Sequence, residues 1–289
     1  MDDQLIDWWP SPAKLNLFLH ILGRNQKGYH LLQTLFQMLD VGDQIAFTLT
    51  DDGKIAMSQS LEGVPDDQNL IVRAARLLQS TCETSKGAII TLDKQLPMGG
   101  GIGGGSSNAA TTLVALNELW NCKLNTTELA ELGLLLGADV PIFIHGLTAF
   151  AGGVGENIYP VKIPCQWYLV ANPGIHISTA EVFAAPELPR NSAAMNWQHY
   201  KFEETRNDCQ TLVTNRHPEV ANLLQWLVHY APSRMTGTGA CVFATFASEA
   251  QAKEVQAKLP DKWSSFVAKG VDQSPLKIKQ QQVRAASDM

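Results

Sequence analysis

Residues 96–110 read Leu96-Pro97-Met98-Gly99-Gly100-Gly101-Ile102-Gly103-Gly104-Gly105-Ser106-Ser107-Asn108-Ala109-Ala110, and they hold six of the 22 glycines in this chain of 289 residues. Glycine accepts positive φ and has no side chain, so consecutive N–H groups can converge on an anion. The following residues indicate a helix over 106–120 that Ser106 or Ser107 caps, and a helix N-terminus attracts negative charge. The stretch therefore predicts a phosphate-binding loop rather than a flexible linker.

Known glycine-rich phosphate motifs fit this stretch poorly. Gly99-x-Gly101-x-x-Gly104 formally matches the dinucleotide fingerprint, but residues 93–97 separate it from the preceding strand, and a helix rather than a strand follows its helix. A P-loop needs a lysine after its last glycine, and here Ser106 follows Gly105. The H-R-D and D-F-G motifs of protein kinases are absent from the sequence.

Outward from the loop, the sequence mixes helix and strand patterns. Residues 13–21 alternate with period 2, which puts Lys14, Asn16, Phe18 and His20 on one face of a strand and apolar side chains on the other. Further strands are expected near 31–39, 43–50, 87–92, 167–171, 241–246 and 263–268, with Asp52-Gly53 as a hairpin turn between 45–50 and 54–58. Helices are expected over 68–80, 126–136 (capped by Thr126 or Thr127 and stopped by Gly137), just after Asp139, and near 207–228 and 248–258. The irregular alternation favours an α+β fold over a doubly wound sheet.

Composition and charge exclude several classes of protein. Hydrophobic residues make up 45% and charged residues 17% of the chain, as in ordinary globular proteins. The net charge of -6 argues against a nucleic-acid binder. No apolar run is long enough to span a membrane, and the first residues do not resemble a secretory signal. Five scattered cysteines without a C-x-x-C pair suggest reduced thiols in a cytoplasmic protein, with Cys241 in a packing role.

The proline-containing stretch 152–173 is the best candidate for a domain boundary. We therefore expect one domain over 1–160 and a second over 161–276. The polar tail 277–289 is expected to be frayed.

Three motifs together resemble the GHMP family of small-molecule kinases. The first is the loop Pro97-x-x-x-Gly101-Ile102-Gly103-Gly104-Gly105-Ser106-Ser107-x-Ala109; the others are Pro12-Ala13-Lys14-Leu15-Asn16 and Thr236-Gly237-Thr238-Gly239-Ala240-Cys241. Gly28-Tyr29-His30 and Leu136-Gly137-Ala138-Asp139-Val140-Pro141 are similar to one branch of this family. The resemblance covers nearly the whole chain up to about Leu276. Ile102 replaces the usual leucine conservatively, whereas Asn108 stands where many members have aspartate, so no catalytic role is assigned to it.

The resemblance implies a fold and a reaction. The first half is expected to be like domain 2 of ribosomal protein S5 and the second half ferredoxin-like, with the active site in the cleft between them. That branch of the family transfers the γ-phosphoryl group of ATP to the 2-hydroxyl of a methylerythritol unit carried on cytidine diphosphate, in the non-mevalonate route to isoprenoids. The implied partners are small molecules, without nucleic acid or membrane, and the enzyme would be a monomer or homodimer.

Two residues are expected to act on the reacting groups. The resemblance makes Asp139 the residue that orients or deprotonates the attacking hydroxyl, although an aspartate there could also simply cap the next helix. It places Lys14 beside Asp139, where the ammonium would offset negative charge on the transferring group. A lone lysine on a strand is otherwise more often solvated.

The resemblance also suggests binding residues. ATP would be held by Pro97, Met98, Gly99, Gly100, Gly101, Ile102, Gly103, Gly104, Gly105, Ser106 and Ser107, with Lys94, Asn69 and Leu70 nearby, and Mg²⁺ would arrive as the ATP complex. An ordinary surface role for Lys94 is about as consistent with the sequence. The acceptor would be bound by Asn16, Tyr29, His30, Thr179 and Phe183. Tyr29 and Phe183 would sandwich cytosine while His30 binds its edge, unless the two rings are merely half-buried packing.

Three alternatives remain open. The first is a sister GHMP kinase acting on homoserine, mevalonate or a sugar, which Gly28-Tyr29-His30 argues against. The second is a nucleotide-binding regulator without catalysis, which the presence of Lys14 and Asp139 argues against. The third is an RNA-binding module of S5-like ancestry, which the acidic charge disfavours.

Overall fold

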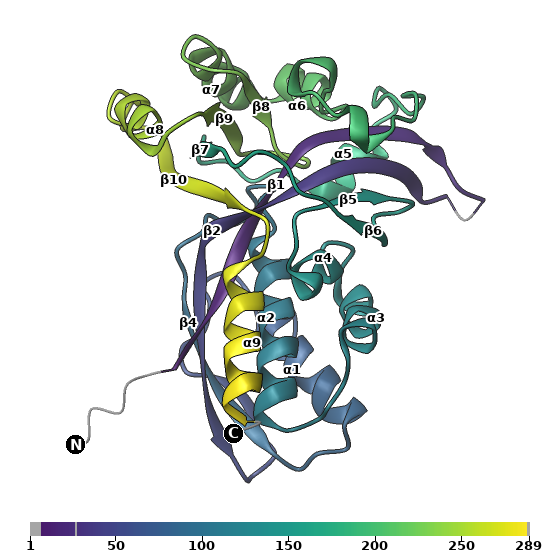
Figure 1. Cartoon of the computed structure of the whole chain (residues 1–289), viewed down its shortest axis with the longest axis vertical. Helices are drawn as coiled ribbons and strands as arrows, with labels where there is room; N and C mark the ends of the chain where they lie inside the picture. Colours follow the sequence, from purple (N-terminus) through teal and green to yellow (C-terminus); the bar gives the residue numbers. More distant parts are fainter. Residues whose placement is uncertain (1–6, 27, 288–289) are drawn as a thin grey trace.

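Two long antiparallel strands form the axis of the molecule. The computed structural model describes residues 7–26 and 28–287. Strand β1 (Trp8–Arg24) pairs with β2 (His30–Thr50), so the two strands expected at 31–39 and 43–50 are one continuous strand. Figure 1 shows both strands running from the lower, helix-rich half of the molecule into the upper half. Each half is therefore built on the same pair of strands.

In the lower half, helices cover one face of the sheet. Strand β4 (Gly87–Asp93) pairs antiparallel with β2, and β3 (Ile55–Met57) pairs parallel with the far side of β4. The expected hairpin at Asp52-Gly53 is therefore wrong. After β2, the chain passes the position of β4 and forms β3 on the far side of β4, so β2 and β3 are not neighbours in the sheet. The helices of this half are α1 (Leu70–Thr81), α2 (Gly104–Leu119), α3 (Thr126–Leu136) and α4 (Val140–His145), followed by the hairpin of β5 (Ala149–Gly152) and β6 (Asn157–Pro160).

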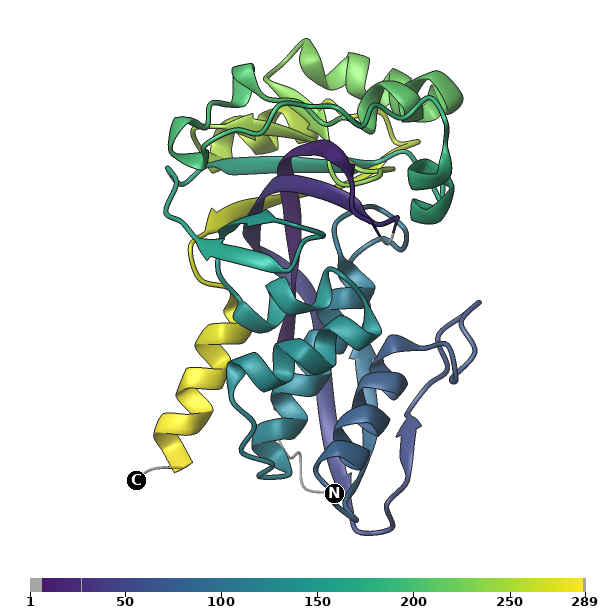
Figure 2. The ribbon, with the colours of Figure 1, turned by 90° about the vertical axis from the view of Figure 1, so that its right-hand side faces the viewer.

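The upper half continues the sheet in the order β2-β10-β7-β9-β8. Its strands are β7 (Trp167–Asn172), β8 (Ser233–Met235), β9 (Val242–Phe246) and β10 (Ser264–Val271). Its helices are α5 (Thr179–Ala184), α6 (Gln210–Arg216), α7 (Pro218–Val228) and α8 (Glu249–Gln256), with short 3-10 turns at Trp197–His199 and Phe202–Glu204. Figure 2 shows the green helices of this half, α6 and α7, above its strands. The expected helix over 207–228 is two helices, since Pro218 begins the second.

Three apolar clusters hold this arrangement together. One lies among the lower helices, and one lies among the upper helices and strands. The third joins the halves, since it includes Leu15 and Phe18 of β1, Ile102 of the glycine-rich loop and Phe243 of β9. The glycine-rich loop is thus anchored where the two halves meet. The α+β architecture with a site between two halves agrees with the expectation from the sequence.

The chain end forms a helix rather than a frayed tail. Helix α9 (Pro275–Ser287) returns to the lower half and lies beside α2 and β1 (Figure 1). Arg284 donates to the carboxylate of Glu118 on α2, at 2.6 Å, and Leu276 is buried in the lower apolar cluster. The expectation of fraying over 277–287 is therefore wrong, and residues 288–289 lie outside the described part. The boundary at residues 160 and 161 stays a prediction.

Among the described residues, no helix is both long enough and apolar enough to cross a membrane.

Substitution of α9 tests its contribution to stability. Leu276 is 1% exposed, so Leu276→Ala should lower the free energy of unfolding by about 2–4 kcal/mol through lost burial and a residual cavity. Ile278 lies two residues further and is 43% exposed, so Ile278→Ala should cost well under half as much. Urea unfolding measures both variants. Equal, small effects would contradict the docking of α9.

Candidate active site

The glycine-rich loop has a conformation that residues with side chains rarely adopt. Gly99, Gly101 and Gly103 have φ of 67°, 72° and 78°, in the left-handed region. A Cβ on Gly101 would lie 2.5 Å from the Thr236 carbonyl oxygen, and one on Gly103 would lie 2.6 Å from the Phe143 ring. Helix α2 starts at Gly104 with Gly103 as its N-cap, so the expected serine cap is wrong and both serines lie inside the first turn.

The start of α2 leaves backbone N–H groups without partners inside the helix. The N–H of Ser107 donates to the Gly103 carbonyl at 2.8 Å, which makes it the first intrahelical bond. The N–H groups of Gly104, Gly105 and Ser106 precede it and have no carbonyl within the helix to bind. They point outward at the positive end of the helix dipole, where a phosphate group can accept from them.

The second glycine-rich turn, residues 236–241, clamps the loop from the upper half. The N–H of Cys241 donates to the Gly100 carbonyl at 3.1 Å, and a Cβ on Gly237 would lie 2.9 Å from the Gly101 carbonyl oxygen. Cys241 is buried, and burial raises the pKa of its thiol to about 12. The expected packing role of this cysteine agrees with its position against Gly100.

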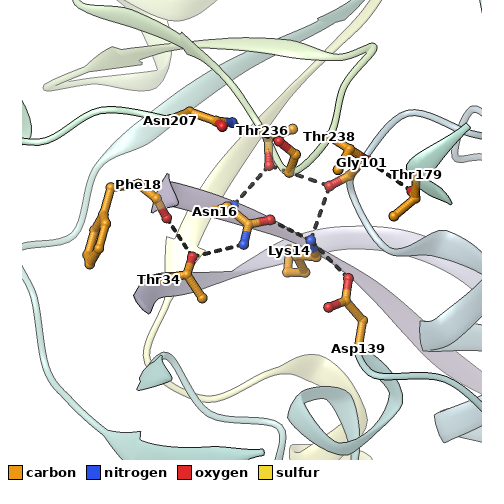
Figure 3. A network of polar contacts seen from close by, with 11 residues as sticks. Lys14, Asn16, Phe18, Thr34, Gly101, Asp139, Thr179, Asn207, Thr236 and Thr238 are labelled. Atoms are coloured by element: carbon orange, nitrogen blue, oxygen red, sulfur yellow. Dashed lines mark hydrogen bonds and ion pairs between the residues drawn. The ribbon is translucent and has the colours of Figure 1, made fainter. Parts of the chain in front are cut away.

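Lys14 and Asp139 form an ion pair at the mouth of the loop. The Lys14 side chain is 2% exposed, and its Nζ lies 3.2 Å from Asp139 Oδ2, 2.6 Å from Asn16 Oδ1 and 3.1 Å from the Gly101 carbonyl oxygen (Figure 3). Three acceptors therefore match the three donors of the ammonium. Lys14 is not the solvated lysine that a lone strand position would suggest.

Asp139 is free to act on a ligand. It stands at the N-cap position of α4, but its side chain makes no capping hydrogen bond. The carboxylate is instead held by Lys14 and remains 38% exposed. The alternative that Asp139 merely caps the helix is therefore wrong, and one of its oxygens is available to a hydroxyl group.

A buried polar network fixes the strand that carries Lys14. The backbone N–H of Asn16 donates to Thr236 Oγ1 at 2.9 Å, and Asn16 Nδ2 donates to Thr34 Oγ1 at 2.9 Å (Figure 3). Thr179 and Thr238 share a hydroxyl hydrogen bond of 2.9 Å on the other side of the loop. Strands β1 and β2, helix α5 and the second glycine turn thus meet around one point.

One cavity of 590 Å³ brings most of the expected residues together, a size typical of ligand pockets. Its lining includes these expected residues: Lys14, Asn16, Asn69, Leu70, Lys94, Pro97, Met98, Gly99, Gly100, Gly101, Gly103, Gly104, Gly105, Ser106, Asp139, Thr179 and Phe183. Two further expected residues of the loop, Ile102 and Ser107, are not among the described residues that line the cavity. Ile102 packs in the apolar cluster between the halves, and the Ser107 and Ser11 hydroxyls share a hydrogen bond of 3.0 Å.

Beyond the helix start, the lining is largely apolar. Leu61, Val64 and Leu70 contribute side chains there, and Asn69 caps α1 by accepting from the N–H of Ile71. Lys94 is paired with the buried carboxylate of Asp43 at 2.9 Å, so it is neither free nor an ordinary surface lysine. The part of the cavity beside α1 is therefore an apolar pocket with room for a flat ring, and it lies next to the unpaired N–H groups at the start of α2.

Of the three residues expected around the base, Phe183 lines the cavity, and the sandwich of Tyr29 and Phe183 stays a prediction. Phe183 packs against His30, with ring centroids 5.0 Å apart and planes at 34°. Tyr29 is 64% exposed, and the described cavity lining includes neither Tyr29 nor His30. Burial, together with the charges of Arg24 and Arg190, lowers the pKa of His30 below its usual value.

Several lining residues were not assigned a role from the sequence. Gly237 and Thr238 lie in a motif that was recognised, so their glycine-rich pattern was a usable signal. Asn108 also lines the cavity, and its Oδ1 accepts from Ser11 Oγ at 2.6 Å. Arg190 lies outside the described lining but donates to His30. Its sequence neighbours did not indicate this role, since a single arginine after a short helix is usually solvated.

The described residues offer little to a resident metal ion. Within 7–26 and 28–287, no three His, Cys, Asp or Glu side chains gather at a spacing that could hold one. Asp139 is the carboxylate that lines the cavity beside the phosphate-binding helix start. A divalent cation would therefore be bound mainly through a ligand's own phosphate oxygens and water.

Known proteins share both halves of this chain. Residues 69–147 match the family model of the GHMP kinases N terminal domain, and residues 184–265 match that of the GHMP kinases C terminal. A 4-diphosphocytidyl-2-C-methyl-D-erythritol kinase of Pseudoalteromonas atlantica is 63% identical over 95% of this chain and 96% of its own. A kinase of the same name from Shewanella woodyi is 55% identical over 96% of this chain and 99% of its own.

A solved structure of a similar protein has the same fold as this chain. The crystal structure of a 4-(cytidine 5'-diphospho)-2C-methyl-D-erythritol kinase superposes with a TM-score of 0.81 at 28% identity, covering 92% of this chain and all of the other. The loop, the second glycine turn and the strand carrying Lys14 thus occur within a shared architecture. Since both family models match in chain order and the curated relatives align over almost the whole length, this chain belongs to the GHMP kinases.

Proposed function

We propose that the protein transfers the γ-phosphoryl group of ATP to the 2-hydroxyl of 4-diphosphocytidyl-2-C-methyl-D-erythritol, a step in the non-mevalonate synthesis of isoprenoids. The observation that carries the reaction is the Lys14–Asp139 pair, 3.2 Å apart, in the cavity that also contains the start of α2. The acceptor is proposed because the curated relatives named above are kinases of this compound. GHMP kinases use ATP as the phosphate donor.

The triphosphate would bind at the start of α2, with the base in the apolar slot by α1. The N–H groups of Gly104, Gly105 and Ser106 would bind phosphate oxygens, and Leu70 and Asn69 would border the adenine. We propose Mg²⁺ as part of the ATP complex, where it supplies charge neutralisation for the phosphates. Lys94 would act mainly by holding the loop, through Asp43 and the Leu96 carbonyl.

Asp139 and Lys14 would position the acceptor hydroxyl for transfer. A carboxylate oxygen of Asp139 would accept the hydrogen bond of the acceptor hydroxyl and take its proton as the hydroxyl oxygen bonds to the γ-phosphorus, while the bond from that phosphorus to the bridging oxygen breaks and ADP leaves. The Lys14 ammonium would offset the negative charge that spreads over the transferring group. Because Asn16 and the Gly101 carbonyl hold that ammonium, the cation is preorganised and does not need to move.

The cytidine half of the acceptor would bind between α5 and the β1–β2 hairpin. Phe183 offers a ring face for stacking, His30 offers a polar ring atom at the base edge, and Thr179 lines the cavity below. Tyr29 lies on the same hairpin, next to His30, and we propose that its exposed ring covers the base when the nucleoside is bound. We further propose that the enzyme works in the cytoplasm as a monomer or homodimer.

A panel of acceptors tests the proposed substrate directly. With ATP and Mg²⁺, the cytidyl substrate should yield ADP and a new phosphomonoester detectable by phosphorus NMR. Homoserine, mevalonate and galactose serve as competing acceptors, and turnover of one of them alone would refute the proposed substrate.

Replacing the proposed base tests the chemistry. Asp139→Asn should lower kcat by about 10²–10⁴-fold, because an amide cannot take the hydroxyl proton. Affinity for ATP should change little, and the far-UV spectrum should be unchanged. Asp93→Asn, at an exposed carboxylate outside the cavity, is the matched control. Turnover near wild type in Asp139→Asn would refute the role.

Substitution in the loop tests the phosphate site. In Gly103→Ala, a Cβ would lie 2.6 Å from the Phe143 ring and 3.1 Å from Lys14 Cε, at a φ of +78°. Affinity for ATP, measured by calorimetry, should fall by roughly tenfold or more, given a strain of about 1–3 kcal/mol. Gly174→Ala is the control, because Gly174 has a φ of +82° but nothing within 4 Å of an added Cβ. Comparable ATP affinities in both variants would count against the loop.

Aromatic substitutions test the cytidine site. Phe183→Ala and Tyr29→Ala should each raise KM for the cytidyl substrate about 5–100-fold, since base stacking contributes about 1–3 kcal/mol. KM for ATP should stay within a factor of two. Steady-state kinetics with each substrate varied in turn measures this split, and equal changes for both substrates would refute the assignment.

A further inference from the structure

A fully buried carboxylate stands where the chain leaves the sheet to form the glycine-rich loop. Asp43 on β2 is 0% exposed, and its neighbour Gln44 pairs with Asp93, the last residue of β4. The proposed reaction gives this carboxylate no part, and the described lining of the cavity does not include it. Since a buried charge is costly unless its partners are in place, those partners show what Asp43 holds.

The partners of Asp43 are the three residues that lead into the loop. Its Oδ1 accepts from the N–H groups of Gln95 at 2.8 Å and Leu96 at 2.7 Å. Both carboxylate oxygens accept from Lys94 Nζ, at 3.1 Å and 2.9 Å, and Lys94 Nζ also donates to the Leu96 carbonyl. A Cβ on Gly104 would lie 3.6 Å from Lys94 Nζ. Asp43 thus ties the entrance of the loop to β2 and places the ammonium beside the start of α2.

Ser11, the partner of Asp43 in the β1–β2 register, holds the other end of the loop. Ser11 is also 0% exposed. Its hydroxyl donates to Asn108 Oδ1 at 2.6 Å and shares a hydrogen bond of 3.0 Å with the Ser107 hydroxyl, both near the start of α2. Two paired residues of adjacent strands therefore bind the chain on both sides of residues 97–106.

We propose that Asp43, together with Ser11, is a positioning residue for the nucleotide: the pair fixes both ends of the glycine-rich loop and so holds the N–H groups of α2 and the Lys94 ammonium in place for the triphosphate. The inference rests on the proposed function only in placing the triphosphate at the start of α2. Glycines give a loop little conformational preference of its own. Fixed ends reduce the freedom that the ligand would otherwise have to remove on binding, which raises affinity without a contact to the ligand.

Binding of a non-hydrolysable ATP analogue with Mg²⁺, measured by calorimetry, tests the proposal in the whole protein. Asp43→Asn keeps the volume of the side chain but removes the charge, so affinity should fall about 10–100-fold, because hydrogen bonds to charged groups are strong. Ser11→Ala loses only neutral hydrogen bonds, and affinity should fall about 3–10-fold. In steady-state kinetics, KM for ATP should rise accordingly in both variants, whereas KM for the cytidyl substrate should stay within about a factor of two.

The upper half provides a matched control pair, Ser192 and Asp208, which are 9% and 3% exposed. Asp208 Oδ2 accepts from the Ile21 N–H at 2.7 Å and from Ser192 Oγ at 2.6 Å. Asp208 Oδ1 accepts from Arg206 Nε at 2.8 Å. Asp208→Asn and Ser192→Ala therefore remove a buried carboxylate and a buried hydroxyl of the same kind away from the loop. They should lower Tm about as much as the two substitutions at the loop, yet change affinity for the ATP analogue by less than about a factor of two.

The outcomes separate a positioning role from a purely structural one. Wild-type affinity for the analogue in Asp43→Asn would overturn the inference, and so would an equal loss of affinity in Asp208→Asn at the same Tm. Should Asp43→Asn fail to fold, the comparison of Ser11→Ala with Ser192→Ala decides in the same way, since both variants keep every charge. Absence of phosphorylation of the cytidyl substrate, with the expected differences in analogue binding, would refute the proposed acceptor alone.

Discussion

The structure depends on a cation that is buried on a strand shared by both halves. The Lys14 ammonium is removed from water, which is costly unless each of its three N–H donors has a partner. The partners come from three places in the chain: Asn16 on the same strand, the Gly101 carbonyl in the loop, and Asp139 ahead of α4. The charge is therefore satisfied only when the loop and α4 are both in place. The same contacts that stabilise Lys14 thus hold it beside Asp139, the pair proposed to act in phosphoryl transfer.

Glycine at two distant places makes this assembly possible. Gly101 and Gly237 lie so close that a side chain on either would meet backbone atoms of the other turn. This contact brings the start of α2 and the Lys14–Asp139 pair to the same cavity, which Lys94 also lines in its ion pair with Asp43. A chain with a net charge of -6 can therefore still present a local positive field, because backbone N–H groups and one helix dipole contribute to it beside these two paired lysines. Net charge excludes extended nucleic-acid surfaces far better than it excludes local anion sites.

The sequence predicted the features that depend on neighbouring residues and missed those that depend on distant ones. The bounds of α3 were predicted correctly, although its cap is Asn125 rather than a threonine, since Asn125 and Glu128 form a capping box. The hairpin at Asp52-Gly53 was wrong because β3 finds its partner in β4, beyond the expected neighbour. The chain end looked frayed because the residue that holds it, Glu118, lies 166 positions from Arg284. Most of the expected site residues line one cavity because the glycine pattern and the family motifs specify backbone geometry directly.

The acceptor side of the cavity was the hardest to predict, and the reason is physical. A phosphate site is largely made of consecutive N–H groups, so a short stretch of sequence specifies it. A site for a neutral base, as proposed here, needs a ring face and correctly placed donors, and the candidates lie on a hairpin tip and on α5. Neither segment is informative alone, and Arg190 joins them by binding both His30 and the end of α5.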